Sequence, residues 1–176
     1  RESEAHIVCE GSVRDEVVGP VIDALHLDTD EYEKVLADGT RFQFLYRTKI
    51  ARDFLLSESE HPTHVWEPQT TKLLLELGRD LQGDVLVGGA YFGDQAILVA
   101  KQLAGRGQRV HCFEPNPQQA QMLQRNIDLN HLNNVVVNVA GLWNRSGEHM
   151  RLDGFDSFAN MVSAQDGSGF DTVTMD

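Results

Sequence analysis

The residues best suited to chemistry lie in a glycine-rich stretch and in an acid that follows it along the chain. The stretch runs Gly88-Gly89-Ala90-Tyr91-Phe92-Gly93, directly after an apolar run at residues 85–87. Glu114 lies 21 residues beyond Gly93, at the end of a second apolar run. Glycines let the backbone approach a ligand, and an acid about 20 residues further on can accept hydrogen bonds from ribose hydroxyls. This spacing predicts a site for a nucleoside cofactor.

The elements that must position these residues alternate between strands and helices. Strands are predicted at residues 85–87, 109–113 and 135–139, and the segments between them carry apolar residues at helical spacing. A preceding helix is predicted at residues 68–81, with Pro68 in its first turn. This alternation predicts an α/β fold with a doubly wound parallel sheet of the Rossmann-like type. Because the run 135–139 is β-branched and uncharged, we expect it to be buried on both faces of the sheet.

The first 65 residues differ in character from the rest. A helical face is predicted at residues 17–25, and Asp38-Gly39 predicts a hairpin turn between two strands. A polar segment at residues 57–64 is interpreted as a linker. We therefore predict an N-terminal extension, residues 1–65, which serves as a cap or as the interface of a homodimer. A cofactor-binding α/β domain follows at residues 66–176.

The two ends of the sequence suggest that it is part of a longer chain. It begins at Arg1 rather than Met, and it stops at Asp176 inside a run that alternates like a strand. Further strands are expected at residues 150–152 and 172–175. The C-terminal part of the sheet is therefore expected to be missing, and the α/β domain to be truncated.

Charge and composition restrict the partners. The formal net charge is −12, whereas binding to nucleic-acid phosphates requires clustered Lys and Arg. No stretch approaches the roughly 20 apolar residues of a membrane span. The two cysteines, Cys9 and Cys112, do not form a disulfide framework, which favours a reducing, cytoplasmic environment. We expect neither a nucleic acid nor a membrane as partner.

The glycine stretch fits two cofactors. Set against the dinucleotide fingerprint G-x-G-x-x-G, it matches as Gly88-x-Ala90-x-x-Gly93, with alanine where the central glycine lets the backbone contact a pyrophosphate. This substitution counts against NAD without excluding it. The surrounding residues favour a different nucleoside cofactor.

With those residues included, the chain resembles the class I S-adenosylmethionine-dependent methyltransferases and, within them, the FkbM family. The resemblance rests on Gly89-Ala90-Tyr91-Phe92-Gly93-Asp94 and Phe113-Glu114-Pro115-Asn116-Pro117. It continues through Leu123, Asn126-Ile127, Leu129-Asn130, Asn133-Asn134-Val135 and Ala140-Gly141-Leu142-Trp143, and it covers about residues 66–147. It implies an O-methyltransferase that uses S-adenosylmethionine and modifies a hydroxyl of a sugar or polyketide-like small molecule.

The resemblance also implies a set of binding residues. Those near the methionine and ribose of the cofactor are Gly89, Ala90, Tyr91, Gly93 and Asp94, with Glu114 on the ribose hydroxyls and Pro115, Asn116, Ala140 and Leu142 around the adenine. In many class I enzymes an acid ends the strand before the glycine loop, but Val87 stands at that position here. Asp94 is the candidate to supply the missing charge.

Other residues have two interpretations. Phe92, Trp66 and Glu67 are predicted to contact the acceptor, although Phe92 also suits a core and Trp66-Glu67 suit the start of a helix. His61 and His64 have H-x-x-H spacing, but no cluster completes a metal site, so none is predicted. Asn126 and Asn130 are interpreted as residues that end the second helix.

Three functions remain open at this point. The first is the O-methyltransferase, whose catalytic base the sequence does not identify. The second is an NAD(P)-binding oxidoreductase domain, and the third is a module that keeps the fold without catalysis. Ala90 and the Glu-Pro-Asn-Pro run count against the second function, whereas Val87 is compatible with the third.

Overall fold

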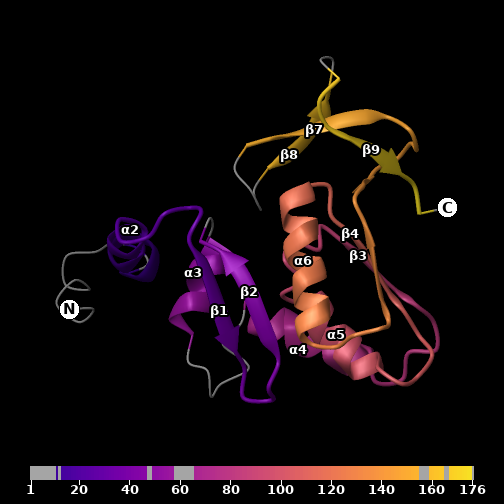
Figure 1. Cartoon of the computed structure of the whole chain (residues 1–176), viewed down its shortest axis with the longest axis horizontal. Helices are drawn as coiled ribbons and strands as arrows, with labels where there is room; N and C mark the ends of the chain where they lie inside the picture. Colours follow the sequence, from indigo (N-terminus) through magenta and orange to yellow (C-terminus); the bar gives the residue numbers. More distant parts are fainter. Residues whose placement is uncertain are drawn as a thin grey trace.

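The structure, a computed structural model, describes residues 11, 13–46, 49–57, 66–154, 159–164 and 167–175. Its elements lie along the chain in the order shown in Figure 1. They are η1 (Arg14–Val18), α2 (Gly19–Asp23), β1 (Glu31–Val35), β2 (Arg41–Leu45), α3 (Lys49–Leu56), α4 (Pro68–Leu77), β3 (Val85–Gly88), α5 (Ala96–Leu103), β4 (Val110–Phe113), α6 (Pro117–Leu129), β5 (Val135–Asn138), β6 (Gly141–Leu142), β7 (His149–Asp153), β8 (Asn160–Ser163) and β9 (Phe170–Val173). The predicted helices and strands are present, with ends that differ by a few residues. The H-x-x-H histidines, most of the predicted linker and Cys9 lie outside the described residues.

A parallel sheet with the order β3-β4-β5 forms the centre of the chain. Val85 pairs with Val110, and Val110 pairs with Val135, so the three strands start level. Each parallel connection crosses over through a helix, α5 between β3 and β4 and α6 between β4 and β5. This arrangement confirms the predicted α/β fold with a Rossmann-like parallel sheet.

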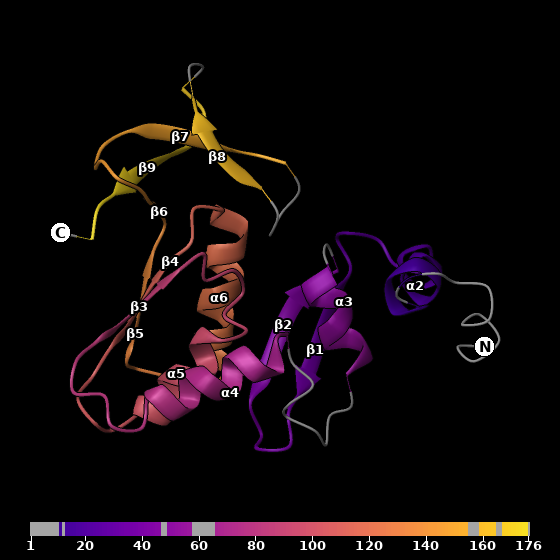
Figure 2. The same ribbon diagram turned by 180° about the vertical axis from the view of Figure 1, so that it is seen from behind.

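The helices α4, α5 and α6 lie on the same side of this sheet (Figure 2). Leu123 and Ile127 of α6 face it and are buried, as predicted. The expected burial of residues 135–139 on both faces is wrong, because β5 is only partly buried and Val139 is 53% exposed. Leu86 of β3 is also 53% exposed, since no described element covers the second face.

The N-terminal hairpin packs against the helical side of the sheet. Asp38-Gly39 forms the turn between β1 and β2, as predicted, and Gly39 has φ +80°. The buried rings of β2 meet a ring from α3 and one from the glycine loop. These four side chains, Phe42, Phe44, Phe54 and Phe92, are fully buried. Their ring centroids lie between 5.1 and 6.3 Å apart in the pairs that touch.

Replacement of Phe54 by leucine tests whether this aromatic cluster joins the hairpin to the sheet. Phe54 contacts the other three rings, so its loss removes aromatic contacts and leaves a cavity. We expect a loss of about 1 to 2 kcal/mol in the free energy of unfolding. Urea unfolding should keep one transition when followed both by near-UV and by far-UV circular dichroism. Two separate transitions would show that the hairpin unfolds independently.

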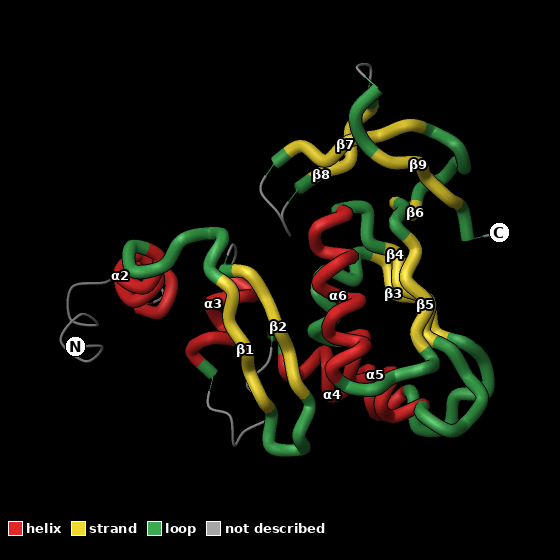
Figure 3. Tube along the Cα trace, viewed as in Figure 1, coloured by secondary structure: helices red, strands yellow, loops and turns green. Residues whose placement is uncertain are grey.

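A second sheet, with the order β6-β9-β7-β8, lies beyond the carboxyl ends of the parallel strands (Figure 3). β6 pairs with β9 in parallel, while β7 pairs antiparallel with both β8 and β9. The strands predicted near residues 150 and 172 are therefore confirmed as β7 and β9. Within the described residues, no helix has the length and apolar character needed to span a bilayer.

Candidate functional site

A cavity of about 250 Å³ opens at the carboxyl ends of β3 and β4. Open α/β sheets bind ligands at this edge, because the loops that follow the strands surround it. The lining comes from the loop after β3, the turn after β4, α3, the start of α4 and the second sheet. Its residues are Ile50, Trp66, Glu67, Gly89, Tyr91, Asp94, Gln95, Glu114, Pro115, Asn116, Gln119, Leu152 and Ala159.

Glu114 follows β4 directly and holds together two turns of the backbone. Its side chain is buried, and its Oε2 accepts a hydrogen bond from the Tyr91 N–H at 2.7 Å. Its Oε1 accepts a hydrogen bond from the Asn116 N–H at 2.9 Å. Asn116 in turn caps α6, since its Oδ1 accepts from the N–H groups of Gln118 and Gln119. The carboxylate therefore has a set orientation at the wall of the cavity.

The backbone of the glycine loop donates to protein acceptors. The N–H groups of Gly89 and Ala90 both point to the Phe113 carbonyl, at 2.9 and 3.2 Å. The N–H of Gly93 donates to the Ala90 carbonyl at 2.9 Å. Together with the bond from Tyr91 to Glu114, these contacts tie the loop to the end of β4. These four N–H groups of the loop already donate to acceptors within the protein.

Asp94 lies at the N-terminal end of α5 and is 8% exposed. The pKa of its carboxyl is raised to about 7, mainly by burial; the backbone N–H groups of Asp94 and Gln95 act in the opposite direction, and the nearby Glu67 adds to the rise. The helix dipole also favours a negative charge at this end of α5. The carboxyl of Asp94 therefore lines the cavity and can be either protonated or ionised near neutral pH.

The raised pKa of Asp94 predicts a pH dependence of stability. Between the unfolded value of 3.8 and the folded value of about 7, the folded chain binds one more proton than the unfolded chain. Stability should therefore fall as the pH rises through this window, by an amount of order 4 kcal/mol. Replacement of Asp94 by asparagine should flatten this dependence and make the variant more stable than the wild type at pH 8.

Urea unfolding of both proteins at pH 5 and pH 8 would measure this effect. The exposed Asp80 provides the matched control, because Asp80→Asn should leave the pH dependence of the wild type unchanged. Parallel pH profiles for the wild type and Asp94→Asn would contradict the assignment.

Eight of the residues predicted for the site line the cavity. They are Trp66, Glu67, Gly89, Tyr91, Asp94, Glu114, Pro115 and Asn116. The others predicted for the cofactor, Ala90, Gly93, Ala140 and Leu142, are not among its lining residues. Phe92, predicted to contact the acceptor, lies in the aromatic cluster and is fully buried. Their predicted contacts with ligands stay predictions.

Five lining residues were not predicted from the sequence. Gln119 lies in the first turn of α6, close to the Glu-Pro-Asn-Pro run, and Gln95 follows Asp94, so proximity to the motifs could have suggested both. Ile50 lies on α3, while Leu152 and Ala159 lie in or beside the second sheet. The sequence carries no local signal for these three.

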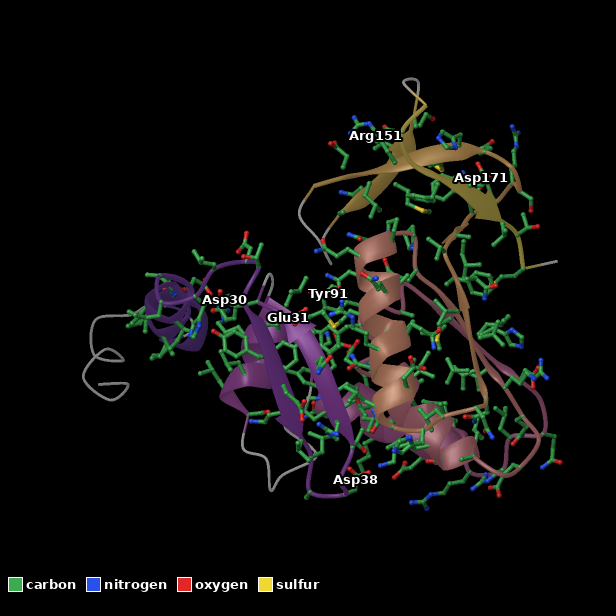
Figure 4. The ribbon with its side chains drawn as sticks, viewed as in Figure 1. Asp30, Glu31, Asp38, Tyr91, Arg151 and Asp171 are labelled. Carbon is green, nitrogen blue, oxygen red and sulfur yellow. The ribbon has the colours of Figure 1, made fainter. Side chains whose placement is uncertain are left out.

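The cavity has a polar and an apolar part. Glu67, Asp94 and Glu114 supply carboxyl groups, and no Lys, Arg or His occurs among the described lining residues. Ile50, Leu152 and Ala159 supply apolar surface from elements outside the parallel sheet. Glu67 has φ +48°, a conformation uncommon for a residue with a Cβ atom. Figure 4 places Tyr91 between the hairpin and α6.

No protein-family model matches the chain, and no curated protein does. Among solved structures, the chain is similar to TYW2 of M. jannaschii, solved in complex with AdoMet, with 21% identity and a TM-score of 0.44 over 65% of this chain and 45% of that one. It is similar to Trm5b from Pyrococcus abyssi, with 19% identity and a TM-score of 0.42 over 63% and 28%. A SAM-dependent O-methyltransferase from Thermotoga maritima gives 15% identity and 0.38 over 69% and 59%.

The chain spans less than two thirds of the length of each of these three proteins. Similarity at this level assigns neither a family nor an activity to the chain. The resemblance to the FkbM family therefore stays a prediction.

Proposed function

We infer that the cavity binds S-adenosylmethionine and that the chain belongs to a methyltransferase that modifies a hydroxyl of an uncharged small molecule. The observation that carries this proposal is the carboxyl of Asp94 at the N-terminal end of α5. In dinucleotide-binding folds, this helix end receives the pyrophosphate, because its N–H groups and its dipole favour an anion. Here the Asp94 carboxylate already interacts with the N–H groups of Asp94 and Gln95.

The loop supports the same choice of cofactor. A pyrophosphate needs free N–H groups in the glycine loop, whereas those of Gly89, Ala90, Tyr91 and Gly93 donate to protein acceptors. Its negative charge would also lie close to the carboxyl groups of Asp94 and Glu67. S-adenosylmethionine has no phosphate, and its ammonium and sulfonium groups are positively charged. The acidic lining therefore fits this cofactor better than NAD.

The residues of the chain have distinct roles in this proposal. Glu114 accepts hydrogen bonds from the ribose hydroxyls, and its two backbone contacts hold it in place for that purpose. Asp94 and Glu67 offset the positive charge of the cofactor. S-adenosylmethionine supplies a methyl group that is already activated, so the protein has to orient the acceptor and exclude water. Orientation alone can contribute about 7–11 kcal/mol to such a step.

The acceptor is proposed to be a sugar or polyketide-like molecule with a free hydroxyl. Its support is the apolar part of the cavity, formed by Ile50, Trp66, Leu152 and Ala159, together with the absence of Lys and Arg among the described lining residues. Binding of a nucleic acid relies on basic groups that neutralise phosphates. The catalytic base stays unassigned, and the homodimer and the cytoplasmic location stay predictions.

Calorimetric titration of the chain with S-adenosylhomocysteine and, separately, with NAD tests the proposal. S-adenosylhomocysteine shares the adenosine and amino-acid parts of the proposed cofactor, so binding of this ligand and not of NAD is the expected result. Binding of NAD, or of neither ligand to a chain shown to be folded by circular dichroism, would contradict it. Binding of S-adenosylmethionine should also release protons near pH 7, because a cation beside Asp94 lowers the pKa of its carboxyl.

A further inference from the structure

The outer edge of β2 is paired with a helix rather than with another strand. Asn130, the C-cap residue of α6, accepts a hydrogen bond from the Arg41 N–H at 2.9 Å and donates to the Arg41 carbonyl at 2.7 Å. Asn126, one turn earlier, accepts from the Gln43 N–H at 2.6 Å and donates to the Gln43 carbonyl at 2.8 Å. Two asparagine amides thus take the place of a neighbouring strand.

The spacing of the two asparagines explains why this pairing works. Four residues of helix rise about 6.0 Å, and two residues of strand rise about 6.6 Å. Asn130 therefore lies opposite Arg41 and Asn126 opposite Gln43, and these are alternate strand residues whose backbone groups face away from β1. Each amide has a donor and an acceptor, so it can satisfy both backbone groups of one strand residue. This contact sets the register of the hairpin on α6.

Asn126 makes one contact that Asn130 lacks. Its Nδ2 also donates to the carbonyl of Phe92 at 2.8 Å, inside the glycine loop, and its side chain is fully buried. In the same loop, the preceding residue Tyr91 has φ +50° and the following residue Gly93 has φ +94°. Glu114 accepts from the Tyr91 N–H, at the start of the same segment. Two side chains therefore bind the backbone of segment 91–93: Glu114 binds the Tyr91 N–H, and Asn126 binds the Phe92 carbonyl.

We propose that Asn126 is a positioning residue for the cofactor loop, which it couples to the N-terminal hairpin through the Phe92 carbonyl. The positive φ of Tyr91 is unfavourable for a residue with a Cβ atom unless surrounding contacts hold it, whereas glycine at position 93 adopts such a value readily. Glu114 constrains the N-terminal side of this segment. On the other side, Asn126 adds a side-chain contact to the backbone bonds that Gly93 makes with Ala90 and Ile97. The hairpin thereby becomes part of the scaffold of the cavity. The effect on ligand affinity rests on the function proposed above, whereas the effect on loop order does not.

Asn130 is the matched control, because it makes the same contact with β2 and none with the loop in the described hydrogen bonds. Asn126→Ala and Asn130→Ala should both lower stability. Only Asn126→Ala should speed hydrogen exchange at the N–H groups of Tyr91 and Gly93, measured by NMR. It should also weaken binding of S-adenosylhomocysteine by roughly tenfold, the value of one hydrogen bond, while Asn130→Ala stays within about twofold of the wild type.

Hydrogen exchange and ligand affinity test the role of Asn126 and the identity of the cofactor separately. If the wild type does not bind S-adenosylhomocysteine, the exchange rates still test the role of Asn126. Wild-type exchange at Tyr91 and Gly93 in Asn126→Ala would overturn the proposal, as would equal changes of exchange or affinity in both variants. If Asn126→Ala does not fold, Asn126→Ser takes its place, with smaller changes in the same direction.

Discussion

Replacement of Glu114 by glutamine is expected to weaken binding of S-adenosylhomocysteine about 100-fold, nearly as much as replacement by alanine. Both carboxylate oxygens of Glu114 accept backbone N–H groups, from Tyr91 and from Asn116. A glutamine amide has one oxygen and one NH₂ group, so in either orientation its NH₂ group faces a backbone donor. The glutamine must therefore turn away or displace the loop. Both responses remove its oxygen from the position proposed to bind the ribose.

The expected size follows from the bonds that are lost. Hydrogen bonds to charged groups contribute about 1.5–3 kcal/mol each, and two bonds to the ribose together correspond to about 100-fold or more in affinity. Glutamine is usually the mildest replacement for glutamate. A loss of affinity close to that caused by alanine would therefore indicate that both oxygens of Glu114 are needed as acceptors. Calorimetric titration of the two variants and of the wild type measures the difference.

Glu76 on the exposed surface of α4 provides the control for the Glu114 variants. Glu76→Gln removes the same charge outside the cavity and should leave the affinity unchanged. Glu114→Gln that binds within about fivefold of the wild type would show that Glu114 does not accept the ribose hydroxyls as proposed. Circular dichroism at the titration temperature confirms that each variant is folded.

Replacement of Gly93 by alanine is expected to lower the free energy of unfolding by about 3–5 kcal/mol. Two costs add at this position. Gly93 has φ +94°, where a residue with a Cβ atom is strained. A Cβ atom would also lie 2.6 Å from Leu123 Cδ1 and 3.0 Å from Ile97 Cγ1. Leu123 and Ile97 are both fully buried, so neither can move aside without disturbing the packing of α5 and α6 on the sheet.

Gly89 separates these two costs. Its φ is +66°, but a Cβ atom there would meet no atom within 4 Å. Gly89→Ala should therefore show the backbone cost alone, about 1–2 kcal/mol. Urea unfolding of both variants would measure the difference, which reports the steric part at Gly93. Equal losses in the two variants would show that packing around Gly93 adjusts, contrary to the expectation.

The sequence predicted the parts of the site that depend on neighbouring residues. Glu114 and the glycine loop were identified by their spacing and Asn116 by the family resemblance, and all three contribute to the lining of the cavity. The hairpin turn at Asp38-Gly39 was predicted because these two residues suit the turn locally. Asn130 was correctly placed at the end of α6, where it is the C-cap residue.

Residues whose role depends on distant partners were assigned less well. Asn126 was interpreted as ending the helix, whereas it is buried within α6 and contacts residues 34 and 83 positions away along the chain. Phe92 was predicted to contact the acceptor or to lie in the core, and its ring is fully buried among those of Phe42, Phe44 and Phe54. These partners of Asn126 and Phe92 come from distant segments of the chain, so the local sequence does not indicate the contacts.

The sequence by itself determined the order of strands and helices, the turn chemistry and the position of an acid at the end of β4. These properties follow from hydrophobic periodicity and backbone preference, which act over a few neighbouring residues. Only the tertiary structure decided that the N-terminal hairpin pairs with α6, and that α3 and the second sheet help to line the cavity. These contacts join segments far apart in the chain, and they form because buried apolar side chains and backbone polar groups must find partners in space, wherever those partners lie in the sequence.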